Sequence, residues 1–281
     1  MILENLNAVV TGSSSGIGKE IAFHLAETGL NVILGGRNPK KIQETDRELK
    51  EKFSDKNVEV ITADLSDFQG VKEFSEKVKS RFKRLDILIN NAGAFFPVHS
   101  YNSEGIENTF ALNHLGYFRL TGLLLPLLQK SSAARIINTS SNAHKKAKLD
   151  LNDLNLEKSY NGWKAYSRSK LANILFTREL SRRLEKSSIT VNAFHPGVIA
   201  TDIVRMLPFP VPQLYRFYAG TVKDGAEGGI FLALDESVKN TTGLYFKGKN
   251  FHTVSREAAD PATAANLWEC SEKFQELKWA Y

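Results

Sequence analysis

The sequence predicts an α/β fold: a doubly wound parallel sheet flanked by helices, in a single domain spanning residues 1–281. Short apolar segments alternate with amphipathic helical segments at the spacing of βαβ units, which favours parallel strands joined by crossover helices. The first apolar segment leads into a glycine-rich loop that opens a helix. No repeat or linker divides the chain, and an apolar content of 42% is enough for one large core.

The first unit is a strand over 6–10, a glycine loop over 11–18 and a helix. Backbone N–H groups must approach a pyrophosphate closely while the N-terminus of the helix faces its charge, and side chains at the loop glycines would obstruct this. The spacing is Gly-x-x-x-Gly-x-Gly rather than the common Gly-x-Gly-x-x-Gly. A glycine-rich turn without a ligand is the alternative. The loop residues expected at a dinucleotide are Gly12, Ser14, Ser15, Gly16, Ile17 and Gly18.

The second strand, over 31–36, ends where a fold specific for NAD places an acidic residue, about 20 residues beyond the glycines. This chain has Arg37 there. An arginine without a competing carboxylate suits a 2′-phosphate, so NADP(H) is the expected cofactor. An ordinary surface arginine is the alternative.

A helix over about 39–53 leads to a third strand over 58–62, which is followed by Asp64 and Leu65. Both are candidate cofactor residues, because ligands bind at the carboxyl ends of parallel strands. The Asp64 carboxylate could accept a hydrogen bond from an adenine amino group, or it could cap the helix that begins near Asp67. The sequence leaves both roles open.

The fourth strand, over 85–89, follows a helix that ends near residue 82, and the strand leads into an Asn-Asn-Ala-Gly run. The candidate cofactor residues in this run are Asn91, Ala92 and Gly93. A long helix over about 103–130, kinked or ended by Pro126, carries Asn113 midway. Asparagine is unfavourable inside a helix, so Asn113 is a candidate functional residue, with an exposed polar position as the alternative.

The fifth strand, over 134–139, places Ser141 where it could bind a substrate oxygen. Tyr166 and Lys170 then share one face of a helix that ends near residue 184. The pKa of a free tyrosine is about 10, and a neighbouring ammonium favours the phenolate. The pair could therefore act as a general acid or base. An exposed helix face is the alternative for a Tyr-x-x-x-Lys pattern taken alone.

A sixth strand over 189–194, a helix over 225–234, a strand over 243–246 and a helix over 262–279 complete the chain. The segment around 199–222 has an apolar and aromatic density that is unlike a solvated loop. We rank a substrate lid first, a membrane-contacting patch second and part of a dimer interface third.

The net charge is +6, but the basic residues lie in short scattered groups. We expect solvated surface, with anionic lipid or a phosphorylated cofactor as the alternative, and no nucleic-acid partner. Cys270 is the single cysteine, so no intrachain disulfide can form, and no metal-ligand cluster accompanies it. The N-terminus lacks a signal peptide, and no apolar run reaches the roughly 18–20 residues that span a bilayer. A cytoplasmic location is the expectation, with peripheral membrane contact left open.

Taken together, these motifs resemble the short-chain dehydrogenase/reductase family over nearly the whole chain. The motifs that carry the resemblance are Thr11 to Gly18, Asn90 to Gly93, Asn113, Ser141, Tyr166 with Lys170, and His195-Pro196-Gly197. Residues 110–118, 169–176 and 267–272 are most similar to the retinol dehydrogenase-like branch. The resemblance implies a Rossmann-type fold and a homodimer built on the helix that carries Tyr166. Two departures are the 25 positions between Ser141 and Tyr166, which imply a loop insertion over 142–162, and the lack of a hydrophobic N-terminal anchor.

The resemblance also implies the residue roles. Tyr166 would transfer a proton, Ser141 would hold the carbonyl oxygen, Lys170 would hold the nicotinamide ribose, and Asn113 would anchor a proton-relay water. Tyr166 would also contact the cofactor. Further contacts would come from Pro196, Gly197, Val198 and Thr201, with Val198 on the carboxamide and Thr201 near the phosphates.

The expected function is therefore that of an NADP(H)-dependent oxidoreductase, which transfers hydride between the nicotinamide and a lipophilic carbonyl or alcohol: an aldehyde, a ketone or a retinoid-like compound. The alternative is a non-catalytic NADP(H)-sensing module. The Ser, Tyr and Lys set argues against a sensor, because a sensor needs no titrating phenol.

Overall fold

The computed structural model describes residues 6–53, 58–197, 220–275 and 278–279. Within these residues the strands form one eight-stranded sheet in the order β3-β2-β1-β4-β5-β6-β7-β8. The strands are β1 (Asn7–Thr11), β2 (Asn31–Gly36), β3 (Val58–Thr62), β4 (Ile87–Asn90), β5 (Arg135–Thr139), β6 (Thr190–His195), β7 (Tyr245–Lys247) and β8 (Asn250–Phe251). Among these eight strands, only the short β8 pairs antiparallel. The predicted doubly wound parallel sheet is confirmed, with its switch point between β1 and β4.

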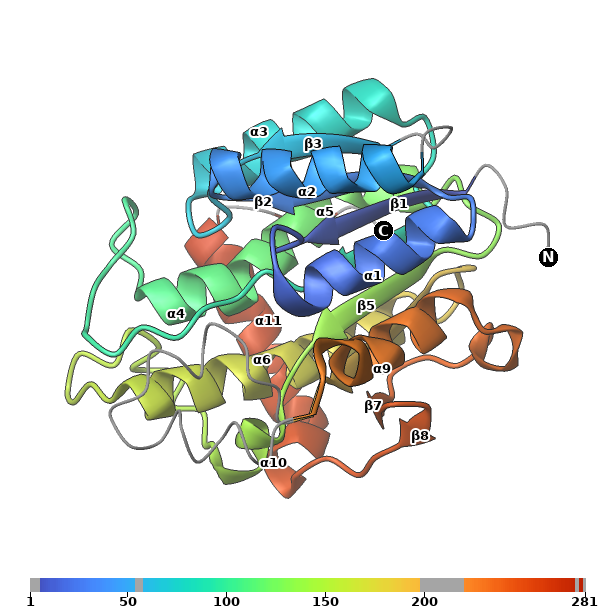
Figure 1. Ribbon diagram of the computed structural model, residues 1–281. Coiled ribbons are helices and arrows are strands. Elements are labelled where there is room, and N and C mark those ends of the chain that lie inside the picture. The colour runs from blue at the N-terminus through green and yellow to red at the C-terminus, as the bar shows by residue number, and fades with distance from the viewer. Residues whose placement is uncertain (1–5, 54–57, 198–219, 276–277, 280–281) are drawn as a thin grey trace.

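Of the helices that the structure describes, three pack directly on each face of the sheet (Figure 1). One face carries α1 (Gly16–Glu27), α2 (Pro39–Lys52) and α9 (Val222–Leu234), and the other carries α3 (Phe68–Arg81), α5 (Gly116–Leu128) and α6 (Gly162–Arg183). Successive strand residues point to opposite faces: Val9 belongs to the core beneath α3 and α5, and Val10 to the core beneath α1. Both faces of the central strands are therefore buried, as their continuous apolar runs predict.

A C-terminal layer covers the outside of α6. It consists of α10 (Arg256–Ala259) and α11 (Pro261–Gln275), and Figure 1 shows α11 in red, passing behind α5 and α6. The Trp268 ring lies 4.8 Å from the Phe118 ring and 5.9 Å from the Phe176 ring, centroid to centroid. Apolar residues of α6, Leu171 among them, are thus buried within the chain by Leu267 and its neighbours. A homodimer stays a prediction, and α11 occupies this face of α6.

The prediction of one helix over about 103–130 is wrong at its start. The chain forms α4 (Asn108–Phe110), a π-helical segment η1 (Ala111–Leu115) and then α5. The Glu107 carboxylate accepts hydrogen bonds from the backbone N–H groups of Thr109 and Phe110, at 2.7 and 2.8 Å, and so caps the helix there. Pro126 lies in the last turn of α5, which ends two residues later.

Short elements were missed or misplaced by the sequence reasoning. The predicted 142–162 loop contains the 3-10 helix η2 (Asn142–Lys146), and η3 (Glu236–Val238), α10 and β8 were not predicted. The predicted start of α9 at 225 was late, because a capping box between Thr221 and Asp224 begins the helix at Val222. The C-terminal helix begins at Pro261 and is described to Gln275; residues 278–279, which the prediction included, are not helical. None of the helices described has both the length and the apolar character needed to cross a membrane.

Candidate active site

A cavity of about 1070 Å³ lies along the carboxyl ends of the strands, from β3 to β7. It collects nearly all of the candidate residues that the structure describes. Its walls include Gly12, Ser14, Ser15, Gly16, Ile17, Arg37, Asp64, Leu65, Asn91, Ala92, Gly93, Ser141, Tyr166, Lys170, Pro196 and Gly197. Gly18 and Asn113 lie just behind the wall. Val198, Thr201 and most of the predicted lid around 199–222 fall outside the described residues.

The glycine loop is held against the end of β4. Gly12 has a φ of +65°, and a Cβ there would come within 2.6 Å of the Ala92 Cα atom. A Cβ on Gly18 would collide with the Asn91 side-chain nitrogen and the Gly12 carbonyl oxygen. These two glycines therefore allow the loop to pack on its neighbours, whereas the sequence argument assigned them only to an unobstructed approach of the ligand.

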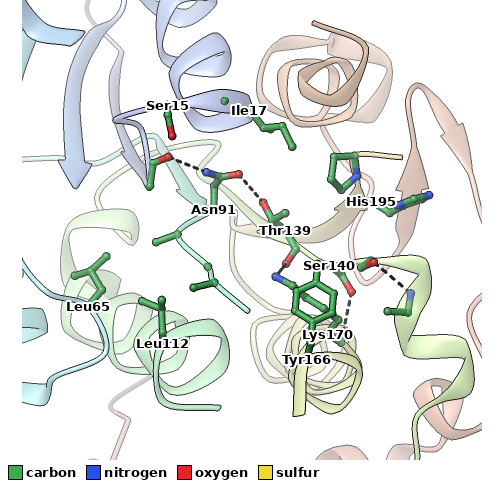
Figure 2. A pocket seen from close by; sticks show the side chains of 18 of the residues that line it. Ser15, Ile17, Leu65, Asn91, Leu112, Thr139, Ser140, Tyr166, Lys170 and His195 are labelled. Atoms are coloured by element: carbon green, nitrogen blue, oxygen red, sulfur yellow. Dashed lines mark hydrogen bonds between the residues drawn. The ribbon is translucent and has the colours of Figure 1, made fainter. Parts of the chain in front are cut away.

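Asn91 joins the ends of three strands (Figure 2). Its amide nitrogen donates hydrogen bonds to the Thr11 and Gly12 carbonyl oxygens, at 3.0 and 3.3 Å. Its amide oxygen accepts from the Thr139 hydroxyl at 3.4 Å. Asn91 consequently links the glycine loop after β1, the turn after β4 and the end of β5.

Arg37 is not free of a competing carboxylate. Its Nη1 atom lies 3.6 Å from Asp64 Oδ2, and the two side chains are 65% and 40% exposed. The parallel pairing of β2 with β3 brings these two strand ends together. Of the two roles left open for Asp64, capping is excluded, since Asp67 accepts from the Gln69 and Gly70 backbone N–H groups and caps α3.

Lys170 and Tyr166 point into the same part of the cavity, one turn apart on α6 (Figure 2). The Lys170 ammonium donates to the Thr139 carbonyl oxygen at 3.2 Å. The Lys170 side chain is buried, and burial lowers its pKa from 10.5 to about 7. Lys170 can therefore change its charge near neutral pH, and it favours the Tyr166 phenolate only in the pH range where it is protonated.

Asn113 is fully buried on the π-helical segment, so the alternative of an exposed polar position is wrong. Its amide pairs with the backbone of Ala94: the side-chain nitrogen donates to the carbonyl oxygen at 3.0 Å, and the side-chain oxygen accepts from the N–H at 2.9 Å. A Cβ on Gly93 would lie 3.1 Å from the Asn113 oxygen and 3.5 Å from Lys170 Nζ. Both side chains thus meet at Gly93, and π-helical turns are frequent at functional sites.

Ser141 follows β5 and begins η2. Its hydroxyl oxygen accepts a hydrogen bond from the Ala143 N–H at 3.2 Å. Its carbonyl oxygen accepts from the Nδ1 atom of His144 at 2.7 Å and from the His144 backbone N–H at 3.1 Å. Sequence reasoning missed His144, because a lone histidine three residues after a serine matches no motif.

An aromatic group beside Tyr166 was also missed. The Trp163 ring lies 5.2 Å from the Phe95 ring and 6.0 Å from the Tyr166 ring, and the Phe95 ring is 6.3 Å from that of Tyr166. Trp163 lines the cavity and is 44% exposed. Its position three residues before Tyr166 on a helix was the available signal. We call Phe95, Trp163 and Tyr166 the aromatic wall.

His195 closes the end of the cavity at β6. Its Nδ1 atom accepts a hydrogen bond from the Gly197 N–H at 3.0 Å, which fixes the turn that contains Pro196. Burial, together with the charge of Lys247, lowers the pKa of His195 to about 4. The ring is therefore neutral at physiological pH, and the acceptor role of Nδ1 is retained.

Comparison with known proteins gives a consistent family. A family model described as short chain dehydrogenase matches residues 6–208. Retinol dehydrogenase 12 from Homo sapiens is 38% identical over 273 residues, which cover 96% of this chain and 86% of that protein. A crystal structure from Mycobacterium paratuberculosis has a TM-score of 0.81 at 31% identity and covers 99% of this chain and 96% of its own. A short chain dehydrogenase structure from Escherichia coli CFT073, complexed with NADPH, has a TM-score of 0.72 at 26% identity, covering 89% of this chain and 98% of that one.

Proposed function

The chain belongs to the short-chain dehydrogenase family, and we propose that it is an NADP(H)-dependent oxidoreductase for lipophilic carbonyl compounds or alcohols. The observation that carries this proposal is the meeting of Ser141, Tyr166 and Lys170 in one cavity, with Asn113 directly behind it. A hydroxyl donor, a phenol and an ammonium are the groups needed to bind a carbonyl oxygen and to deliver a proton to it.

The cavity residues fit a dinucleotide. The N-terminus of α1 and the backbone of the glycine loop border the cavity and suit a pyrophosphate, while Arg37 suits a 2′-phosphate at the end of β2. The residues proposed to hold the cofactor are those of the glycine loop, Arg37, Asp64 and Leu65, Asn91 to Gly93, Tyr166, Lys170, and Pro196 to Val198 with Thr201. When bound, the nicotinamide would supply or accept the hydride.

In the direction of reduction, Tyr166 donates its proton to the carbonyl oxygen. The Ser141 hydroxyl donates a hydrogen bond to the same oxygen and thereby polarises the carbonyl. The Lys170 ammonium stabilises the phenolate left on Tyr166, and Asn113 anchors the water through which a proton returns. In the direction of oxidation, the Tyr166 phenolate removes the proton of the alcohol.

NADP(H) rather than NAD(H) is supported by Arg37 and by the absence of an acidic residue at that position after β2. Asp64 lies close enough to pair with Arg37, so a 2′-phosphate must compete with this carboxylate. The pair is largely exposed, and an exposed ion pair is worth at most about 1 kcal/mol. A phosphate held bidentately can displace it.

A lipophilic substrate is supported by the aromatic wall, which places apolar ring surface directly beside the proposed proton donor. The name of retinol dehydrogenase 12 gives its substrate as retinol, which is a lipophilic polyene alcohol. We extend that class to the present chain as a proposal.

NADPH consumption by the wild-type protein and by Tyr166→Phe tests the function, with retinaldehyde, medium-chain aldehydes, ketosteroids and quinones as substrates. We expect turnover of at least one lipophilic carbonyl and a loss of about 10²-fold or more in the variant, with NADPH binding retained. Near-normal turnover by Tyr166→Phe would overturn the assignment of the acid. NADPH binding without consumption across the panel would favour the sensor instead.

A further inference from the structure

We infer that His144 is a positioning residue for Ser141, and that it fastens the serine to the C-terminal part of the chain. This inference rests on the proposed function for the catalytic role of Ser141. His144 lies three residues after Ser141 on η2, and its imidazole is completely buried. It lies behind the serine, so any effect on the reaction acts through Ser141.

The contacts of the ring define its tautomer. The Ser255 N–H group points at the Nε2 atom of His144, at 3.3 Å. A backbone N–H can only donate, so Nε2 must accept and carry no proton. The proton of the neutral ring is then on Nδ1, where it is donated to the Ser141 carbonyl oxygen at 2.7 Å. Burial lowers the pKa of His144 below its usual value and keeps the ring neutral.

This arrangement orients the hydroxyl of Ser141. The backbone carbonyl oxygen of Ser141 accepts two hydrogen bonds from His144. The hydroxyl oxygen accepts from the Ala143 N–H, which occupies one lone pair. A serine whose oxygen already accepts one hydrogen bond keeps its O–H proton for another acceptor, and we assign that acceptor to the substrate oxygen.

The residues that hold His144 in place lie beyond the region that the family model matches, which ends at 208. Besides Ser255, the Tyr245 ring lies 5.1 Å from the His144 ring, edge to face, and its hydroxyl donates to the Asn142 side-chain oxygen at 3.3 Å. The Leu149 N–H contacts the Glu257 carboxylate at 3.5 Å. The segment from β7 to α10 therefore forms the back of the serine site, and His144 is its central contact.

Two substitutions at His144 separate positioning from packing. His144→Leu removes both ring hydrogen bonds, whereas His144→Asn places an amide nitrogen near the site of Nδ1 and can still donate to Ser141. We expect His144→Leu to lower kcat by about 10- to 100-fold, with the Kd for NADPH changed less than threefold. His144→Asn should recover most of the lost kcat.

A second pair of variants tests the hydrogen bond from the Ser255 N–H to the His144 ring without changing the ring itself. Ser255 has a φ of −66°, which proline adopts without strain. Ser255→Pro and Ser255→Ala both remove the hydroxyl that caps α10 by accepting from the Ala258 N–H, but only proline also removes the backbone N–H. We expect a lower kcat in Ser255→Pro than in Ser255→Ala.

Wild-type kcat for His144→Leu would overturn the inference. So would parallel losses of kcat, NADPH affinity and melting temperature that His144→Asn does not restore, since these indicate packing alone. An inactive wild type would instead count against the proposed function. In that case the ¹⁵N chemical shifts of the His144 ring still test the hydrogen bonds of the ring. A proton on Nδ1 is expected, and a proton on Nε2 would refute the hydrogen bond from Ser255.

Discussion

The Nζ atom of Lys170 lies 5.6 Å from the centroid of the Tyr166 ring, one turn away on the same helix. The same ammonium is buried and contacts the Thr139 carbonyl oxygen as a donor. Burial brings its pKa down to about 7. The Lys170 ammonium, which the proposed mechanism needs, therefore lowers the free energy of unfolding.

Lys170→Met should lower turnover by about 10²-fold or more and yet raise the melting temperature of the cofactor-free protein. The folded pKa of about 7 lies below the unfolded value of 10.5. The buried ammonium is thus most destabilising below pH 7, and its effect fades as the pH rises from 7 to about 10.5. Each kcal/mol gained raises the melting temperature by about 2–4 °C.

Thermal melts at several pH values and single-turnover rates check this prediction. Lys164→Met is the matched control, because Lys164 is exposed on the same helix and is absent from the cavity wall. A melting temperature that falls in Lys170→Met, or a gain that grows above pH 8, would contradict the argument.

Arg37→Gln should raise the KM for NADPH by about tenfold or more, since a charge-assisted hydrogen bond contributes about 1.5–3 kcal/mol, and leave the KM for NADH nearly unchanged. Asp64→Asn should lower the KM for NADPH, because it removes the charge that competes for Arg37 and keeps a side-chain oxygen that can accept from the adenine amino group. Steady-state kinetics with both cofactors measure these effects. Arg47→Gln, an equally exposed arginine on α2, controls for net charge. Equal changes for both cofactors in Arg37→Gln would refute phosphate recognition.

Trp163→Ala should raise the KM for retinaldehyde relative to that for a short aldehyde by about tenfold, because a long substrate loses the ring surface of the aromatic wall. Phe251→Ala is the control: Phe251 is an exposed aromatic residue on β8 and does not line the cavity. The ratio of the two KM values is the measurement. An unchanged ratio would place the substrate on another wall.

The protein should lose stability as the pH falls from about 6.5. His114 is buried, with its Nε2 atom 3.0 Å from the Ser271 hydroxyl, and burial lowers its pKa to about 3. Because the unfolded chain takes up the proton first, the contribution of His114 to stability is complete above pH 6.5 and declines below it. The slope is up to about 1.4 kcal/mol per pH unit for each such histidine.

Urea titrations between pH 4 and 7.5 test this, with His114→Gln as the variant. Glutamine cannot take up a proton, so its slope should be shallower by up to the same amount. An identical slope in the two proteins would show that His114 does not cause the acid sensitivity.

Much of the fold followed from periodicity. The bounds predicted for β2 and β3 are those observed, and α2 and α3 end within one residue of their predicted ends. The error at the start of the helix over 103–130 has a local cause, since Glu107 caps α4 through its side chain. Such a polar contact leaves no trace in the apolar pattern.

The candidate site was predictable where a motif marks a strand end, as at the glycine loop and at Tyr166. The ion pair between Arg37 and Asp64 depends on the pairing of β2 with β3, which the sequence does not state. His144 depends on a contact with Ser255, 111 positions away. A contact between residues so far apart in the sequence can be identified only in the folded structure.

The π-helical turn at Ala111–Leu115 makes this part of the chain sensitive to its length. A π turn contains one residue more than an α turn, so a single deletion there could restore a regular helix. The residues on one side would then rotate by about 100° relative to those on the other. Asn113 would lose either its alignment with Ala94 or its register with α5. A change in the number of residues here would move Asn113 away from Ala94 and from Gly93, where Lys170 also lies.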